Sequence, residues 1–313
     1  MKNRQFDLVA VGHIVKEMII FPDRELGPVL GSPPAYCLVA SAKQGMITGI
    51  ITKIGTDFPD NLIQQLVLAG VDTNGISKKE TSSSSQLVYD AKGNKKISFP
   101  TRAEHIYPSD IPKAYTNCKM IYVCTMEDDV QLEFLKSFSD IGDESAIDLG
   151  GFGGVHMSET RRSTILDVPS FALEAASHFH LVKASDEDCR TIFGASYSLE
   201  KLVRKLLRSK TKVSIITLGS QGVLLGIKEQ GVFHIPPLEG SPVDATGGGD
   251  TFMAGFLSEY IRSGDILNSI IFGAATAICV IEKTGGVSIE RMPTVYQVKK
   301  RIPKNFASKI AIL

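Results

Sequence analysis

The sequence has no excess of charge of either sign and no long hydrophobic run. Lys plus Arg and Asp plus Glu each number 34, so the formal net charge is zero. A general nucleic-acid-binding protein would normally carry a basic excess, so we expect no nucleic-acid partner. The longest apolar stretch, residues 270–281, is too short to cross a bilayer. We expect a buried helix there and no membrane association.

Cysteine is scarce and scattered. The five cysteines are Cys37, Cys118, Cys124, Cys189 and Cys279. No pair of them has the spacing of zinc ligands, and scattered buried thiols fit a reducing compartment. The early apolar run at 6–15 stops at Lys16 and Glu17, which is not the pattern of a secretory signal. We therefore expect a cytoplasmic protein.

Two familiar nucleotide-binding motifs are also missing. No Gly-x-Gly-x-x-Gly follows the first expected strand, which argues against a dinucleotide-dependent reductase. A run of glycines does occur at 247–249, but no Lys-Ser or Lys-Thr follows it, so it is not a Walker A loop.

Strand-like and helix-like segments alternate along most of the chain. Apolar patterns predict strands at 6–11, 47–54, 120–124, 145–149, 179–183 and 213–218, and helices at 35–42, 60–69, 130–138, 171–177, 199–207, 251–262, 266–281 and 295–302. Strands that alternate with helices form parallel βαβ units with helices on both faces of the sheet. The 313 residues therefore predict a single α/β domain, with ligands at the C-terminal ends of the strands.

Residues 81–101 break this alternation. Gln86–Tyr89 and Lys95–Phe99 flank a turn at 91–94 and predict a β-hairpin. A hairpin inserted in an alternating chain is not expected in the central parallel sheet. We expect it to form a small β lid together with residues 14–22. Because exposed sheet edges seek partners, we also expect a homodimer through the lid.

Residues 244–250 read Asp-Ala-Thr-Gly-Gly-Gly-Asp and precede an amphipathic helix. Phe252, Phe256 and Tyr260 recur on one side of that helix. Glycines at a helix start let backbone N–H groups approach an anion, and the helix dipole favours negative charge. Asp250, in or next to the first turn, could accept a proton from a hydroxyl that attacks phosphorus. A plain glycine turn with an acidic helix cap has the same spacing, and the segment alone leaves both interpretations open.

The extended segment 244–256, DATGGGDTFMAGF, resembles the C-terminal signature of the ribokinase-like (PfkB) carbohydrate kinases. Three more segments resemble that family in the expected order: VAVGH at 9–13, the Gly-x-Asp to Gly-Val-x-Thr stretch at 50–76, and TLGSQG at 217–222. Several ordered matches are more specific than any single motif. The resemblance implies a three-layer sandwich with a mostly parallel central sheet and a small β lid. It also implies an ATP-dependent kinase acting on a hydroxyl of a sugar or cyclitol.

The resemblance further implies roles for individual residues. Asp250 would be the general base, and the backbone amides of Gly247, Gly248 and Gly249 would form the anion hole. Asp244 would lie near a monovalent cation such as K⁺ that orders this loop. The residues implied at the ATP site are Thr217, Gly219, Ser220, Gly222, Ala274, Thr276, Gly285 and Gly286.

The acceptor side departs from the family pattern. Glu17 is one methylene longer than the family's usual Asp, and Gly31-Ser32-Pro-Pro-Ala-Tyr36 stands where the family reads Gly-Gly-x-x-x-Asn. With His13, these residues form the expected substrate site. The Gly-x-Pro-x-x-Tyr pattern resembles inositol-kinase-like members. Tyr36 could instead stack on a base, so a nucleoside kinase of the same fold stays open.

The family's Asn-x-x-Glu motif has also drifted. Ser185 replaces its Asn and Asp188 its Glu, which leaves an oxygen ligand for Mg²⁺ through water. Asp148 is followed by a glycine-rich loop in place of the family's Asp-x-Asn-x-Arg. Lys183 could reach a phosphate or simply be solvated. This drift leaves open a ligand-binding or regulatory protein that has kept the fold and lost the chemistry.

Overall fold

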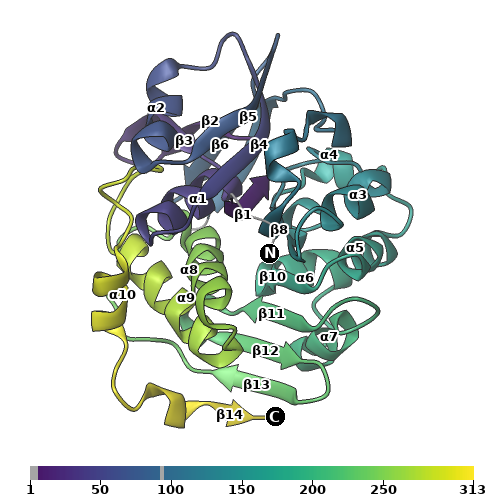
Figure 1. The fold of residues 1–313 in the computed structure, drawn as a ribbon, viewed down its shortest axis with the longest axis vertical. Helices are drawn as coiled ribbons and strands as arrows, with labels where there is room; N and C mark the ends of the chain where they lie inside the picture. The colour runs from purple at the N-terminus through teal and green to yellow at the C-terminus, as the bar shows by residue number, and fades with distance from the viewer. Residues whose placement is uncertain (1–5, 92–94) are drawn as a thin grey trace.

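The structure, a computed structural model, describes residues 6–91 and 95–313 and contains two sheets (Figure 1). The ten strands of the large sheet lie in the order β14-β13-β12-β11-β10-β9-β8-β1-β4-β5. Their bounds are β1 Phe6–Val11, β4 Thr48–Gly55, β5 Asp72–Lys79, β8 Cys118–Val123, β9 Glu144–Asp148, β10 Leu181–Ser185, β11 Val213–Thr217, β12 Val223–Ile227, β13 Gly231–Ile235 and β14 Ala311–Ile312. Pairing is parallel from β5 to β11 and antiparallel from β11 to β14.

Helices cover both faces of this sheet, which confirms the predicted three-layer α/β class (Figure 1). One layer contains α1 Pro33–Lys43, α2 Asp60–Ala69, α8 Gly248–Ser263, α9 Ile266–Ile281 and α10 Val295–Arg301. The other contains α3 Leu135–Ser139, α4 Glu159–Arg162, α5 Val168–Ser177, α6 Asp186–Phe193 and α7 Leu199–Leu206. Alternate residues of β1 face opposite layers: Leu8 and Ala10 belong to one buried cluster, and Val9 and Val11 to the other.

The apolar stretch 270–281 lies in α9, which begins and ends at the predicted residues 266 and 281. Across the described residues, every helix falls short of the combined length and hydrophobicity that a bilayer span requires. The predicted helix at 130–138 is shorter than expected, because Leu132–Phe134 forms a 3₁₀ turn and α3 begins only at Leu135.

The second sheet is the expected lid. Its strands lie in the order β3-β2-β6-β7, with bounds β2 Val15–Ile20, β3 Glu25–Gly31, β6 Ser84–Tyr89 and β7 Lys95–Thr101. The β6–β7 hairpin is confirmed, and three residues of its predicted turn, 92–94, lie outside the described residues. The sheet also recruits β3, which had not been predicted. Because β2 follows β1 directly and β6 follows β5, the lid lies beyond the C-terminal ends of those strands (Figure 1).

Candidate active site

The three glycines begin α8 as predicted, and the first of them has a conformation that favours glycine. Gly247 is the N-cap of α8, with a φ of 76°. Thr251 stabilises the first turn, because its hydroxyl donates to the Gly247 carbonyl at 2.7 Å. A Cβ atom on Gly247 would lie 2.6 Å from Cδ1 and 2.7 Å from Cζ of Tyr36. Gly247 is therefore required both by its backbone angle and by the ring beside it.

Tyr36 is only 2% exposed and lies against this loop. Its hydroxyl donates to the carbonyl of Gly285 at 3.3 Å and accepts from the Arg291 guanidinium at 3.1 Å. Burial, reinforced by the charge of Glu17, raises the pKa of this phenol well above its usual value, so the hydroxyl stays protonated. Stacking on a nucleoside base would require the ring to leave this position. In the conformation described, Tyr36 supports the glycine segment.

A buried lysine lies beside the start of α8. Parallel pairing of β9 and β10 places Lys183 opposite Asp148, and the Lys183 ammonium donates to the Asp148 carboxylate at 2.9 Å. A Cβ atom on Gly249 would lie 3.4 Å from Lys183 Nζ. Burial disfavours the charge of Lys183, but Asp148, Asp188 and Asp250 together raise its pKa above the usual value. The site therefore contains a permanent cation next to the last of the three glycines.

Asp188 lies at the start of α6 and is buried. Its Oδ1 accepts from the amide of Val155 at 2.9 Å, and its Oδ2 accepts from the amide and the hydroxyl of Ser185, each at 2.7 Å. Burial opposes the charge of this carboxyl, but Lys183 and His156 hold its pKa below the ordinary value. Asp188 is thus an ionised carboxylate with both oxygens engaged. Within the described ranges, no three His, Cys, Asp or Glu side chains form a group that could hold a metal ion.

The predicted nucleotide loop lies at the end of β11. Thr217 is half-buried and ends the strand, and Gly219 and Ser220 are exposed in a short 3₁₀ turn. Gly222 has a φ of 91°, and a Cβ atom there would overlap with the carbonyl of Ile235. The loop is therefore a tight turn, and its residues Gly219 and Ser220 are exposed to solvent.

The other predicted nucleotide residues lie on α9 and in the loop that follows it. Gly285 follows α9 with a φ of 121°, and Gly286 packs against Val29 of the lid strand β3. Ala274 is half-buried on α9. Thr276 is fully buried on the same helix, and its hydroxyl donates to the Phe272 carbonyl at 2.9 Å and accepts from the Gln44 amide at 3.1 Å. That hydroxyl therefore lies between Gly255 of α8 and Gln44, the residue that follows α1.

The predicted acceptor residues Glu17, Gly31 and Ser32 come together where the lid meets α1. Glu17 is buried on β2, and its Oε2 accepts from the Ser85 hydroxyl at 2.9 Å. A Cβ atom on Gly31 would lie 2.8 Å from Cδ of Glu17, so the glycine makes room for this carboxylate. Ser32 has a φ of 107°, and its buried hydroxyl has no hydrogen-bond partner among the described residues. Such strain in a non-glycine residue is typical of functional sites.

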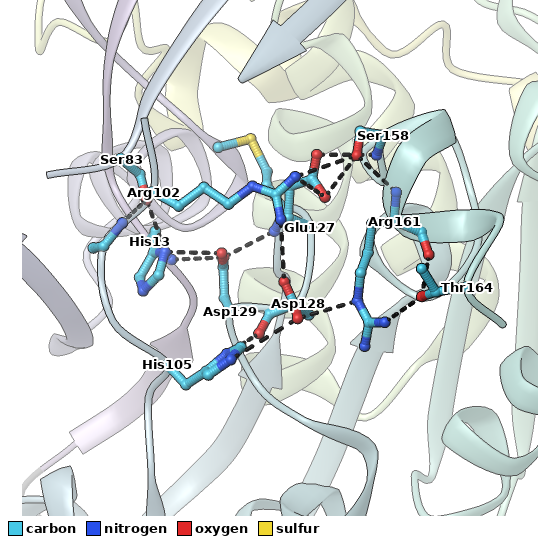
Figure 2. A network of polar contacts seen from close by, with 12 residues as sticks. His13, Ser83, Arg102, His105, Glu127, Asp128, Asp129, Ser158, Arg161 and Thr164 are labelled. Carbon is cyan, nitrogen blue, oxygen red and sulfur yellow. Dashed lines mark hydrogen bonds and ion pairs between the residues drawn. The ribbon is translucent and has the colours of Figure 1, made fainter. Parts of the chain in front are cut away.

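His13 belongs to a polar network between the lid and the end of β8 (Figure 2). Its amide donates to Asp129 Oδ2 at 2.9 Å, and its Nδ1 lies 2.8 Å from Asp129 Oδ1. Arg102 and Glu127 form an ion pair at 2.9 Å in the same network. Burial raises the pKa of Glu127 against the opposing effects of Ser158 and Arg102. The cavity here measures about 270 Å³ and is lined by His13, Arg102, Ala103, Glu104, His105, Glu127, Asp128 and Asp129.

Comparison with known proteins identifies the family to which this chain belongs. Residues 36–293 match the pfkB family of carbohydrate kinases. The chain belongs to the pfkB family. Members of this family transfer a phosphoryl group to a hydroxyl, and the chain is a phosphotransferase of that kind.

The similarity to individual kinases extends over nearly the whole length of this chain. A cytidine kinase from Thermococcus kodakarensis is 28% identical over 290 residues, which cover 90% of this chain and 99% of that protein. A fructokinase from Xylella fastidiosa with bound ATP has a TM-score of 0.78 at 19% identity and covers 95% of this chain and 98% of its own. A Vibrio cholerae O395 fructokinase with fructose, ADP and calcium ion bound has a TM-score of 0.79 at 19% identity, covering 96% and 100%.

Two charged residues of this pfkB-family site were not among the predicted site residues. The sequence suggested that Lys183 could reach a phosphate, although a lysine at a strand end is more often solvated, and Arg291 gave no signal. The available signal for Lys183 was its position at the end of a predicted apolar strand, beside the strand that ends in Asp148. No local motif marks Arg291, because its acceptors on Tyr36, Asp244 and Thr246 lie 45 or more positions away along the chain and the nearer ones are backbone carbonyls.

Proposed function

We propose that the chain transfers the γ-phosphoryl group of ATP to a hydroxyl of its acceptor, with Asp250 as the general base. The acceptor oxygen would attack the γ-phosphorus, its proton would pass to Asp250, and the bond to the β-phosphate oxygen would break to release ADP. The amides of Gly247, Gly248 and Gly249 would receive the charge that develops on phosphorus. The observation that carries the proposal is the glycine-lined start of α8, which has Asp250 in its first turn and the Lys183 cation beside Gly249.

The nucleotide would lie along the open loop that contains Thr217, Gly219, Ser220 and Gly222, with further contacts from the other side. Those contacts would come from Ala274, Gly285 and Gly286. The likeness to a fructokinase with bound ATP supports this donor.

A divalent ion, Mg²⁺, would accompany the nucleotide and neutralise phosphate charge. Asp188 fits a contact to Mg²⁺ through water better than direct coordination, because both of its oxygens already accept hydrogen bonds from Val155 or Ser185.

We propose a nucleoside as the acceptor. The predicted acceptor residues Glu17, Gly31 and Ser32 would hold a hydroxyl-bearing ring, and the cavity of about 270 Å³ beside His13 offers room for more polar groups. Its lining combines cations and carboxylates, which suits the mixed donors and acceptors of a base edge. The likeness to a cytidine kinase over 90% of the chain supports this choice. A free sugar or cyclitol is the second candidate, favoured by the fructokinase likeness.

The test is ADP release over a panel of nucleosides, sugars and inositols. We expect Asp250→Asn to abolish turnover of the best acceptor, because an amide cannot take the proton. Asp265→Asn is the matched control: Asp265 caps α9 by accepting from the Asn268 amide at 3.0 Å, and asparagine caps as well. Undiminished turnover by Asp250→Asn would show that the general base is wrongly assigned. Turnover of a sugar or inositol but of no nucleoside would reject the nucleoside proposal.

We also propose that the chain is a single domain that dimerises through the lid, and that it works in the cytoplasm. The lid sheet ends in the edge strands β3 and β7. Unpaired edges favour strand pairing with a second copy. A monomeric mass by light scattering at micromolar concentration would contradict the dimer. The burial of Cys37, Cys118, Cys124 and Cys189 supports a reducing compartment.

A further inference from the structure

Arg291 is buried beneath the glycine segment, with 3% of its surface exposed. A guanidinium has five N–H donors, and each of these has an oxygen acceptor here. The acceptors are the carbonyl of Lys283 at 3.1 Å from Nε, the hydroxyl of Tyr36 at 3.1 Å and the carbonyl of Gly285 from Nη1, and the carbonyls of Asp244 at 3.4 Å and Thr246 at 3.0 Å from Nη2. The charge is therefore fully satisfied by oxygen atoms.

These acceptors join segments that are far apart in the sequence. Asp244 and Thr246 precede the glycines of α8, whereas Lys283 and Gly285 follow α9. The Asp244 carboxylate accepts from the amides of Thr246 at 2.9 Å and Gly285 at 3.1 Å, and lies 3.9 Å from Nη2 of Arg291. One guanidinium and one carboxylate thus hold the two loops together.

The hydrogen bond to Thr246 acts directly on the first glycine amide. A peptide unit is planar, so the Thr246 carbonyl and the Gly247 N–H turn together. When Arg291 holds that carbonyl, it also fixes the direction of the Gly247 N–H. Arg291 is therefore in a position to orient the amide that the proposed reaction uses.

The residues do not fit the monovalent cation that the family resemblance implies beside Asp244. Such an ion would need carbonyl oxygens, and the carbonyls of Asp244, Thr246 and Gly285 already accept from Arg291. We infer that Arg291 is a built-in cation that positions the anion-binding loop, so the reaction needs no K⁺. It is a positioning residue for the proposed phosphoryl transfer, and the inference rests on that proposed function.

Three variants test the inference. Arg291→Ala removes the charge and leaves oxygen-lined space that K⁺ can enter. Arg291→Met removes the charge and fills the space with a long apolar side chain. Arg301→Ala is the control, because Arg301 forms an ion pair with Glu282 and is 39% exposed.

The first readout compares kcat/KM for ATP in two salts of equal ionic strength, tetramethylammonium chloride and KCl. The tetramethylammonium ion is too large for the site. We expect wild type and Arg301→Ala to be equally active in both salts. Arg291→Ala should lose about 5- to 150-fold in tetramethylammonium, the usual range for coupled sites, and recover in KCl. Arg291→Met should lose activity in both salts.

The second readout is the unfolding temperature in the same salts without substrate, which needs no catalytic activity. Binding of K⁺ to the folded state alone should raise it for Arg291→Ala and not for Arg291→Met or wild type. Recovery of a soluble Arg291→Ala only when K⁺ is present would also support the inference. A wild type that requires K⁺, or an Arg291→Ala variant that responds to K⁺ in neither readout or fails to fold in both salts, would overturn it. A chain inactive on every acceptor would refute the proposed function, while the unfolding temperatures would still decide the role of Arg291.

Discussion

Replacing Gly247 by alanine should destabilise the protein by about 2–5 kcal/mol. The φ of 76° at Gly247 lies in the left-handed region, where a Cβ atom costs roughly 1–2 kcal/mol. The same Cβ would press into the Tyr36 ring, 2.6 Å from Cδ1, and overpacking of this kind costs typically 1–3 kcal/mol. The two costs arise from different contacts of this Cβ atom, one with its own backbone and one with the Tyr36 ring, so we add them.

Gly264 provides a control in the same helix. It ends α8 with a φ of 71°, but a Cβ atom there meets no atom of the described residues within 4 Å. Gly264→Ala should therefore carry only the backbone cost of roughly 1–2 kcal/mol. The gain from a stiffer unfolded chain is the same in both variants and cancels in the comparison. The difference between the two variants in the free energy of unfolding, measured in urea, therefore gives the cost of the contact with Tyr36.

A Tyr36→Ala background separates the ring from the backbone. Without the ring, Gly247→Ala should cost no more than Gly264→Ala, because contacting residues are coupled and distant ones add. Turnover should fall with Gly247→Ala and not with Gly264→Ala, since only the former displaces the first glycine amide. Equal losses of stability for Gly247→Ala and Gly264→Ala in the wild-type background would refute the reasoning.

Two further predictions concern charged side chains. Lys183→Met should lower the free energy of unfolding by about 3–5 kcal/mol, because it leaves the buried Asp148 carboxylate without its cation. Adding Asp148→Asn should recover part of that loss. Urea unfolding measures both variants, and a double variant no more stable than Lys183→Met would contradict the pairing. The hydrogen bond from Lys16, with those from Ser82, lowers the pKa of Asp57 from 3.8 to about 2. Because the folded-state pKa is the lower one, the stability that this carboxylate adds should be present above about pH 4 and lost as the pH falls towards 2. Unfolding of wild type and Asp57→Asn across this range should show a small gap, since Asp57 is largely exposed, that closes in acid; a gap that stays constant would contradict the assignment.

The fold was predictable because its signals are local. Helix α2 has the predicted bounds, since its apolar period and the left-handed Gly70 that ends it lie within a short stretch. Strands β3 and β5 were not predicted. Gly27 and Pro28 interrupt the apolar pattern of β3, and β5 reads Asp-Thr-Asn-Gly-Ile-Ser-Lys-Lys, which is poor in strand-forming residues. Pairing with β4 gives β5 its conformation, and no pattern within β5 itself reports that pairing.

The glycine segment was predictable for the same reason, whereas the direction of side chains around it was not. Thr276 lies on a helix predicted to its last residue, yet the sequence did not show that its hydroxyl lies against Gly255 of α8 and Gln44. An almost wholly apolar helix has no polar face, so the sequence of α9 does not reveal which side looks towards the site. The packing of α9 against α8 and the hydrogen bond with Gln44 fix that side.

The two buried cations, Lys183 and Arg291, show why the placement of charges in the site could not be predicted from the sequence. Lys183 is held by a carboxylate on the neighbouring strand, and that pairing follows from sheet register. Arg291 is held mainly by backbone carbonyls, which every residue possesses and no motif encodes. A signature such as DATGGGD therefore identifies the groups that would meet phosphate. By our inference, the charge that orients those groups is that of Arg291, which lies 41 positions after Asp250. The cation requirement of a pfkB-family chain should accordingly depend on the residue that fills this position more than on the glycine signature itself.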